Sequence, residues 1–455
     1  MVGRSESLRR LAQIAWVLAG YGVKGGLAGA RGRSWGPMGT ALARAFDRLG
    51  PAFVKLGQFL SVRPDLVPPA ALEAFERLQD RAEPVAVDRV LRVAEEELGA
   101  PARRLFREFD PEPVATASLS QVHRAVLPGG APVAVKVQRP GAAQSLQRDL
   151  RLVGRAARLL VALSPLRGRV DPRALWGEVL ETAAAELDFR REAETAETVA
   201  RNLRGVEGVR IPRVYWGWTG RRVLTTEFVE GAKISDPSAR GRGDYPELAE
   251  RGARVFLSQV LEHGLFHADL HPANLLLTPA GEIAYVDFGI TGRLSPEERR
   301  ALLGALAGLL CRDAPLALRH LALLGVGIPR ERVAAFTEEV ATVMDRALVP
   351  RLGELPMGEI GRGILAAVHR HRVVFPRKHA LLIKALVTIE GTARLLHPGF
   401  SFEREARNYL SELARKGVTL GGLAELAWRA AALIGVGAVT AAESGGGSET
   451  SRRRP

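Results

Sequence analysis

Two short stretches decide the fold: His267-Ala-Asp269-Leu-His-Pro-Ala-Asn274 and, shortly after it, Val286-Asp287-Phe-Gly289. They place an aspartate, an asparagine and a second aspartate on two neighbouring segments. Carboxylate and amide oxygens are the hard ligands that magnesium prefers when it also binds nucleotide phosphates. The residue types therefore predict that Asn274 and Asp287 hold Mg²⁺ and that Asp269 faces the reacting phosphate.

A lysine closes the β-branched run Val133-Ala-Val-Lys136. Taken alone, this run predicts a buried strand with a surface lysine. The order of the segments favours a different interpretation, because the lysine strand, an acidic helix, the His-x-Asp segment and Asp-Phe-Gly follow one another as in protein-kinase-like folds. We therefore expect Lys136 to contact the α- and β-phosphates of ATP.

The glycine-rich loop that covers the phosphates in kinases is missing. Its place is taken by Val114-Ala-Thr-Ala117-Ser118-Leu-Ser-Gln121-Val-His123, which contains no glycine. Methyl groups restrict the backbone and fill space where phosphates would lie. We expect a changed nucleotide pose and slower or redirected phosphoryl transfer. A plain small-residue turn between two strands is the alternative.

These residues resemble the UbiB family of atypical kinase-like proteins, which is linked to isoprenoid quinone biosynthesis. The alanine-rich loop of that family is matched by Ala115-Thr-Ala-Ser-Leu-Ser-Gln121-Val-His-Arg, with Thr116 as a departure. Its Lys-x-Gly-Gln motif stands as Lys55-Leu-Gly57-Gln58, and its Glu-x-Asp motif as Glu186-Leu-Asp188. The run from Leu382 through Lys384 to Gly391 is also similar, and Ala273 replaces a frequent glycine.

The resemblance implies an α+β, two-lobed protein-kinase-like fold with a helical N-terminal extension that lies over the nucleotide site and excludes polypeptide substrates. It implies ATP and Mg²⁺ as cofactors and pairs Glu192 with Lys136. The link Glu227-Phe-Val-Glu230-Gly231 resembles the hinge between the lobes, whose backbone would meet the adenine, and a plain strand end is the alternative. The implied catalytic residues are Asp269, Lys136 and Glu192, and the implied nucleotide-binding residues are Lys55, Gln58, Ala115, Ala117, Ser118, Gln121, Lys136, Glu186, Asp188, Glu227 and Val229.

Helix geometry constrains two of these motifs. Lys55 and Gln58 are three residues apart, so a helix places them on one face. Glu186 and Asp188 are two residues apart and cannot both point the same way on a regular helix. Either the helix begins near Glu186, or only one of the two carboxylates meets Lys55.

The charge balance favours anionic partners. The chain of 455 residues has a formal net charge of +14, which suits a nucleotide or an anionic membrane surface. Aromatic residues make up only 6%, and we find no zinc pair and no basic-aromatic pattern, so nucleic acid is not expected as a partner. Cys311 is the only cysteine, which excludes an intrachain disulfide and fits a reducing cytoplasm with Cys311 in the core.

Both ends of the chain are candidates for membrane contact. Leu8, Leu11, Ala15 and Leu18 follow helical spacing near Trp16, and we prefer an interfacial amphipathic helix there. A helix packed on the core and a cleaved signal peptide are the alternatives. The apolar segment from residue 420 to 442 is expected to rest on the membrane or on the C-lobe, and residues 444–455 to be disordered.

The chain divides into an amphipathic segment (1–35), a helical extension (36–110), an N-lobe (111–232), a helical C-lobe (233–415) and an apolar segment with a basic tail (416–455). Strands are expected at Val122–Val126, Val133–Val137, Ile211–Trp216 and Arg222–Phe228, with a short pair at Leu275–Leu277 and Ile283–Val286. Long helices are expected from Ala142 to Leu163 and from Leu175 to Leu203, and almost all of Pro296 to Leu413 is expected to be helical.

The segment after Asp269 argues against a regulated protein kinase. Ala268 stands where such kinases carry arginine, and no Ala-Pro-Glu follows Asp-Phe-Gly. A transition-metal site on His267, Asp269 and His271 is disfavoured by the neighbouring oxygen ligands.

The resulting expectation is an ATP-dependent atypical kinase or ATPase that lies peripherally on the cytoplasmic membrane and supports ubiquinone or menaquinone production. Quinone-biosynthesis proteins or lipophilic quinone precursors would be further partners. A phosphotransferase acting on a protein or small molecule, and a nucleotide-gated scaffold, are the two alternatives.

Overall fold

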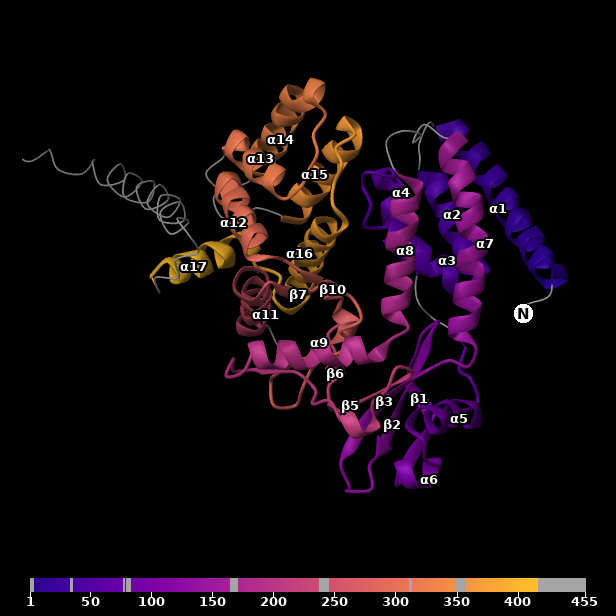
Figure 1. The fold of residues 1–455 in the computed structure, drawn as a ribbon. Helices are drawn as coiled ribbons and strands as arrows, with labels where there is room; N and C mark the ends of the chain where they lie inside the picture. The colour runs from indigo at the N-terminus through magenta and orange to yellow at the C-terminus, as the bar shows by residue number, and fades with distance from the viewer. Residues whose placement is uncertain are drawn as a thin grey trace, which may run out of the picture.

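The computed structural model describes residues 4–32, 36–76, 78, 83–163, 171–236, 245–310, 313–348 and 357–415. A mostly antiparallel N-lobe, a helical C-lobe and a layer of N-terminal helices surround one central region (Figure 1). The α+β class and the two-lobed arrangement expected from the sequence are confirmed.

The N-lobe is built on a four-stranded antiparallel sheet in the order β1-β2-β3-β5. The expected strands become β2 (Ser120–Val126), β3 (Pro132–Gln138) and β5 (Val223–Glu227). The sequence reasoning missed β1 (Glu108–Thr116), because Pro111 and Pro113 hide its pattern. Proline is tolerated there because β1 is an edge strand of the sheet. Helices α5 (Val87–Leu98) and α6 (Ala102–Leu105) precede the sheet.

The N-terminal helices form a separate layer with its own apolar core. Phe53 is buried there, and Phe46 stacks on Phe75 with ring centroids 5.4 Å apart. Proline at the first turn of α3 and α8 suits a helix start, since that position needs no N–H. The layer contains α1 (Arg4–Gly32), α2 (Gly36–Leu49), α3 (Pro51–Leu60), α4 (Pro69–Glu76), α7 (Ala142–Leu163) and α8 (Pro172–Glu186).

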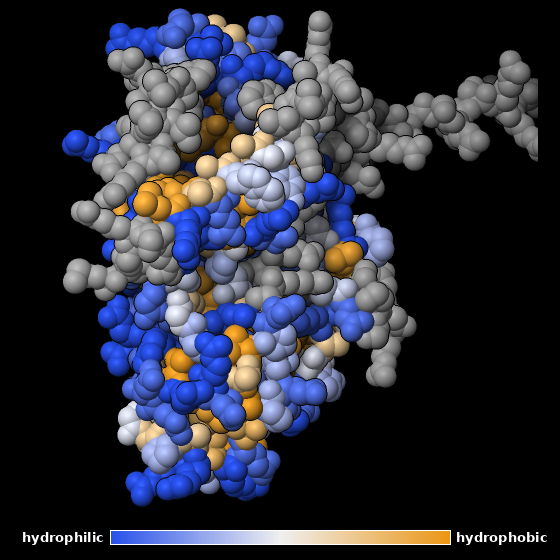
Figure 2. All heavy atoms as spheres, turned by 90° about the vertical axis from the view of Figure 1, so that its right-hand side faces the viewer, coloured by the Kyte–Doolittle hydropathy of each residue, from blue (hydrophilic) through white to orange (hydrophobic). Residues whose placement is uncertain are grey.

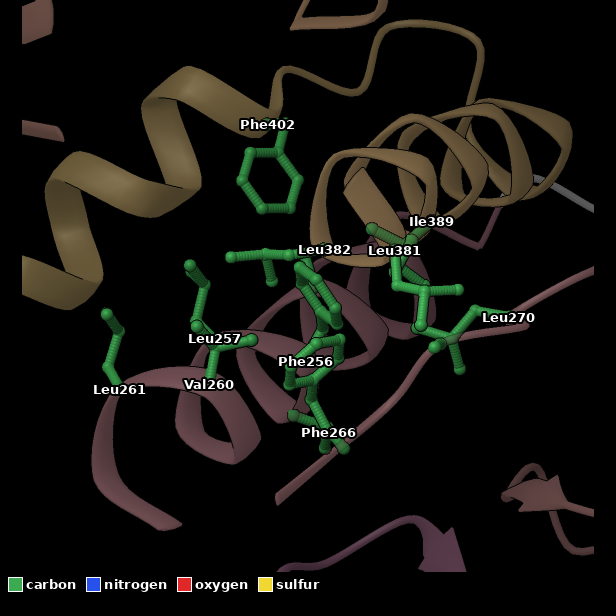
Figure 3. Packing of buried hydrophobic residues seen from close by; sticks show 14 of the residues in the cluster. Phe256, Leu257, Val260, Leu261, Phe266, Leu270, Leu381, Leu382, Ile389 and Phe402 are labelled. Atoms are coloured by element: carbon green, nitrogen blue, oxygen red, sulfur yellow. The ribbon is translucent and has the colours of Figure 1, made fainter. Parts of the chain in front are cut away.

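The C-lobe packs helices around the segment that carries His267 and Asp269. Phe256 lies against Phe266 and Phe402 in the largest apolar cluster (Figure 3). Its helices are α11 (Pro246–Ser258), α12 (Pro296–Leu310), α13 (Ala314–Leu323), α14 (Val333–Leu348), α15 (Met357–His371), α16 (Arg377–Leu396) and α17 (Phe402–Arg415). The helical content expected after Pro296 is confirmed in the described residues.

Short strands frame the catalytic segment within the C-lobe. β8 (Leu275–Leu277) and β9 (Ile283–Tyr285) form the expected pair, in a sheet of order β4-β9-β8-β6 with β4 (Val209–Arg210) and β6 (Ala232–Lys233). β7 (Leu265–His267) pairs with β10 (Thr291–Arg293), so the strand that leads into Asp269 is held against the chain that follows Asp-Phe-Gly.

Two expected elements were wrong. The helix expected from Leu175 to Leu203 is two helices, α8 and α9 (Phe189–Asn202), because Asp188 leaves the helix and caps the second one. The strand expected at Ile211–Trp216 does not form. The short strand β4 ends before this stretch, which contains only a single β-bridge at Val214 and leads into a 3₁₀ turn from Trp216 to Trp218. Pro212 removes a backbone donor near the start of that stretch.

Helix α1 presents two different faces. Ile14 and Val17 are buried against the extension, and Arg10 donates to the buried carboxylate of Asp149 at 2.5 Å. The outer face exposes Leu8 and Trp16, which are 65% and 68% accessible to solvent. The helix therefore packs on the core and still offers an apolar surface. On this side of the molecule, hydrophobic patches interrupt a mainly hydrophilic surface (Figure 2).

Among the described residues, no helix is both long and apolar enough to cross a membrane. The predictions for Cys311, for the apolar segment at 420–442 and for the tail at 444–455 fall outside the described residues.

The C-lobe core yields a stability prediction. Phe256→Ala should lower the free energy of unfolding by about 3–5 kcal/mol, because it removes a buried ring and leaves a cavity. Leu323→Ala, at a side chain that is 69% exposed, is the control and should change stability by less than about 0.5 kcal/mol. Denaturant unfolding measures both, and an equal effect of the two substitutions would contradict the packing described here.

Candidate functional site

A lysine and two acidic residues from three distant segments meet at the centre of the site. Nζ of Lys136 on β3 donates to both carboxylate oxygens of Glu192 on α9, at 2.8 and 2.9 Å. The same ammonium lies 3.3 Å from Oδ1 of Asp287. The pairing of Lys136 with Glu192 expected from the sequence is therefore present, and it connects the N-lobe sheet, α9 and the Asp-Phe-Gly segment.

The three groups shift one another's ionisation. Lys136 holds the pKa of Asp287 well below its usual range, although burial opposes this effect. Burial works against the charged ammonium, but Asp287 and Glu192 raise the pKa of Lys136 above its ordinary value. Burial, reinforced by Asp287, raises the pKa of Glu192. Asp287 is thus the carboxylate that stays ionised and available to a cation.

Asp287 has an unusual backbone conformation. Its φ of +70° lies in the left-handed region, which residues other than glycine rarely adopt. Gly289 stabilises the turn by donating its N–H to Oδ1 of Asp287 at 3.1 Å. This strained turn directs the Asp287 carboxylate to Lys136.

Asn274 is oriented by Asp269. Its Nδ2 donates to the backbone oxygen of Asp269 at 3.1 Å and to Oδ2 of the same residue at 3.2 Å. The backbone of Asp269 is itself held in place, because its N–H donates to Nδ1 of the buried His267 at 3.1 Å. Since the amide nitrogen of Asn274 is engaged, its carbonyl oxygen is the atom left to bind a cation.

The residues present fit a magnesium nucleotide. The Asn274 amide oxygen and the Asp287 carboxylate supply hard oxygen ligands. Within the part of the chain that the structure describes, the backbone N–H and C=O of hinge residue Val229 make no hydrogen bond, and Oε1 of Gln58 is buried without a partner. A bound adenine and a polar ligand group would satisfy these atoms. No group of three or more His, Cys, Asp or Glu suited to a metal occurs among the described residues.

The alanine-rich loop is fixed by contacts on both sides. Ala117 N–H donates to Ser120 O at 2.8 Å, which closes the turn that contains the buried Ser118. Leu119 is buried in the core of the extension. Arg139 donates its backbone N–H to Leu119 O and its side chain to Ala117 O at 3.2 Å. The loop from Ala115 onward is therefore held down rather than free to fold over a ligand.

Two predicted nucleotide ligands have side chains engaged elsewhere. Gln121 is buried, and its amide contacts the backbone of Val85 and Nε2 of His123. The Glu227 carboxylate pairs with Arg210 at 2.5 Å. The structure does not bring these two side chains to the site. Only the backbone of Glu227 could therefore face a ligand at the hinge.

The Lys-x-Gly-Gln and Glu-x-Asp motifs meet through one carboxylate. Nζ of Lys55 on α3 lies 2.6 Å from Glu186 at the end of α8, and both side chains are about one-sixth exposed. Asp188 instead accepts from the N–H of Arg190 at 3.2 Å and caps α9, the helix that carries Glu192. The break at Leu187 is held by Gln138, whose Nε2 donates to its carbonyl at 2.7 Å. Only one of the pair meets Lys55.

The extension also contacts the C-lobe. Arg377 of α16 and Arg63 both lie over the ring of Phe59 on α3, at 5.3 and 5.8 Å from its centroid. Nδ1 of His369 lies 3.1 Å from the carbonyl of Pro64. The Lys-x-Gly-Gln helix α3 is thus held by α8 on one side and by α16 of the C-lobe on the other.

Sequence reasoning missed two residues of this site. Arg139, which holds the alanine-rich loop, follows β3 directly, and only its position after the lysine strand could have drawn attention to it. Lys384 lies 3.6 Å from Oδ1 of Asp269 although it is far along the chain. Its charge within an apolar helical run was the available signal.

Asp188 of the Glu-x-Asp motif should stabilise the protein as the N-terminal cap of α9. Asp188→Asn should keep most of the stability, because asparagine also caps helices, whereas Asp188→Ala should lower the free energy of unfolding by about 1 kcal/mol. Denaturant unfolding measures the difference. Equal losses in the Asn and Ala variants would contradict the capping role.

Comparisons with known proteins agree with this geometry. Residues 77–321 match the ABC1 atypical kinase-like domain, and residues 340–401 match the UbiB helical domain. A probable protein kinase UbiB from Marinobacter nauticus is 34% identical over 391 residues, which cover 85% of this chain and 72% of that protein. The chloroplastic ACTIVITY OF BC1 COMPLEX KINASE 7 of Arabidopsis thaliana is 35% identical over 369 residues, covering 80% of this chain and 53% of that protein.

A solved structure shares the fold. The Mycobacterium tuberculosis protein Rv3197, determined in complex with erythromycin, aligns with a TM-score of 0.54 and 26% identity over 78% of this chain and 90% of its own. The chain spans about half to three-quarters of the length of the two named relatives. With its kinase-like lobes, its lysine-glutamate pair and its helical extension, the chain belongs to the ABC1/UbiB family of atypical kinase-like proteins.

Proposed function

We propose that this protein binds Mg-ATP, hydrolyses it slowly at an anionic membrane surface, and supports isoprenoid quinone production. The observation that carries the nucleotide part is the position of Lys136 between Glu192 and Asp287. Glu192 is buried while Asp287 is half exposed, and a buried charge of this kind is costly unless it is held by an opposite charge or serves a ligand. The quinone part rests on membership of the UbiB family.

Each residue would have a separate task. Lys136 would bind the α- and β-phosphates, and Glu192 would keep its ammonium in position. Asn274 and Asp287 would hold the magnesium ion, which would neutralise phosphate charge when bound. Asp269 would orient a water molecule and accept its proton. Val229 would meet the adenine with its backbone.

The fixed extension supports hydrolysis over protein phosphorylation. Lys55 and Glu186 tie α3 to α8, and Phe59 ties α3 to Arg377 of the C-lobe. A polypeptide acceptor would have to displace these contacts, whereas water would not. Transfer of labelled phosphate from ATP to a protein or small molecule in a membrane extract would favour the phosphotransferase alternative instead.

The membrane part rests on the outer face of α1. Leu8, Leu11 and Trp16 are exposed, and Ala12 and Ala15 lie exposed between them. Arg48 stacks on the Trp16 ring at 5.4 Å, which places a cation beside the apolar surface. An apolar stripe with flanking arginines suits an interface of anionic headgroups, in line with the net charge of +14.

Removing the central lysine or the proposed metal-binding aspartate should strongly slow ATP hydrolysis. Lys136→Met and Asp287→Asn should each reduce phosphate release by roughly two orders of magnitude, because a fixed charge at the reacting phosphates is lost. Calorimetry with ATP and Mg²⁺ should show correspondingly weaker binding.

Matched controls come from residues outside the site. Lys378→Met removes a lysine that pairs with Glu298, and Asp313→Asn changes an aspartate that caps α13. Both should leave binding and hydrolysis close to the unchanged protein. Nucleotide binding that is insensitive to Lys136→Met and Asp287→Asn would overturn the proposal. Retained quinone levels in cells whose only copy carries Asp287→Asn would favour the scaffold alternative.

The membrane contact should depend on the apolar side chains of α1. The double substitution of Leu11 and Trp16 by serine should weaken cosedimentation with vesicles of anionic phospholipid by about tenfold or more, because it removes two large apolar groups from the contact. Leu323→Ser, at another exposed leucine, is the control. Unchanged vesicle binding of the double variant would contradict this surface.

A further inference from the structure

Asp269 has a lysine neighbour that comes from a distant part of the chain. Nζ of Lys384 lies 3.6 Å from Oδ1 of Asp269, while Oδ2 accepts from Asn274 at 3.2 Å. The side chains of Lys384 and Asp269 are 27% and 31% exposed, so both are reachable by a small ligand. Lys384 belongs to α16, within the stretch that matches the UbiB helical domain.

Helix α16 is anchored on the segment that carries Asp269. Oγ1 of the buried Thr392 donates to the backbone oxygen of Leu270 at 3.0 Å. Leu381 and Ile389 belong to the same apolar cluster as Leu270 and lie close to it (Figure 3). Lys384 and Thr392 are eight residues apart, so their side chains project from α16 at directions about 80° apart around the helix axis. A rigid helix therefore delivers the lysine to the site.

The contact contributes little as a purely structural ion pair. Its distance of 3.6 Å exceeds the usual range of an N–H···O hydrogen bond. Partly exposed ion pairs stabilise a fold only weakly. The lysine ammonium sits on a flexible four-carbon stem with three donors, so it can move from the Asp269 carboxylate to a nearby phosphate oxygen.

We propose that Lys384 is a second phosphate-contacting lysine, which binds the γ-phosphate of ATP from the C-lobe as Lys136 binds the phosphates from the N-lobe. This inference rests on the proposed function. The segment from Leu270 to Ala273 contains no lysine or arginine, so the catalytic segment supplies no such cation itself. Fixed cations stabilise the negative charge on the γ-phosphate oxygens during transfer.

The chemical step is hydrolysis of ATP at the γ-phosphate, to which Lys384 contributes only its positive charge. The oxygen of water bonds to the γ-phosphorus, and the bond from that phosphorus to the bridging oxygen breaks. ADP leaves with the electron pair, and the proton of the water passes to Asp269. Lys384 forms no covalent bond and loses no proton.

The test separates a phosphate contact from a mere support of Asp269. Calorimetry with Mg²⁺ should compare ADP with a non-hydrolysable ATP analogue for the unchanged protein, Lys384→Met, Lys384→Arg and the control Lys378→Met. Lys384→Met should lose about 10- to 100-fold in affinity for the ATP analogue and none for ADP, because only the former carries a γ-phosphate. Lys384→Arg should retain part of the preference, and Lys378→Met all of it.

The outcomes distinguish this inference from the proposed function. An unchanged ratio of the two affinities in Lys384→Met, with ADP still bound, would overturn the phosphate contact and leave the nucleotide site intact. A fall in phosphate release without a change of that ratio would show that Lys384 only positions Asp269, and would also overturn the proposed phosphate contact. Failure of the unchanged protein to bind either nucleotide would overturn both.

Discussion

The ion pair between Lys136 and Glu192 is the constraint on which the rest of the site depends. It requires β3 and α9 to lie side by side, and α9 can do so only because the preceding helix stops at Leu187 and Asp188 starts a new one. Lys136 also reaches Asp287, so the same ammonium connects the sheet to the Asp-Phe-Gly turn of the C-lobe. The contacts among these three charged side chains fix the two lobes relative to each other around the place where a nucleotide would bind.

The N-terminal extension acts on the same site from the outside. Lys55 forms an ion pair with Glu186, the last residue of α8, and this pair fixes α3 to the helix that precedes α9. Leu119 of the alanine-rich loop is buried in the core of that extension, and Arg139 holds the loop at its base. A glycine-rich loop moves freely over phosphates, whereas this loop is packed. The extension and the loop are therefore packed together, and under the proposed function this packing would favour water over a peptide as the acceptor.

Local sequence was sufficient for elements with strong patterns. The strand ending in Lys136, the Leu275–Leu277 and Ile283–Tyr285 pair and the helical C-lobe follow from β-branched runs and helical spacing, and Glu192 followed from the resemblance. The edge strand β1 was hidden by two prolines, and the break at Leu187 was hidden by continuous helical spacing. The contact of Gln121 with Val85 depends on tertiary packing, and the charge of Lys384 within an apolar run marked the residue without showing that Asp269 would be its partner.

A crystal structure with Mg²⁺ and a non-hydrolysable ATP analogue tests the central claim most directly. We expect a cation bound by oxygens of Asn274 and Asp287, with the Lys136 ammonium against the α- and β-phosphates and the adenine at the Val229 backbone. A nucleotide bound outside the space between the two lobes, or a cation held without Asp287, would contradict it.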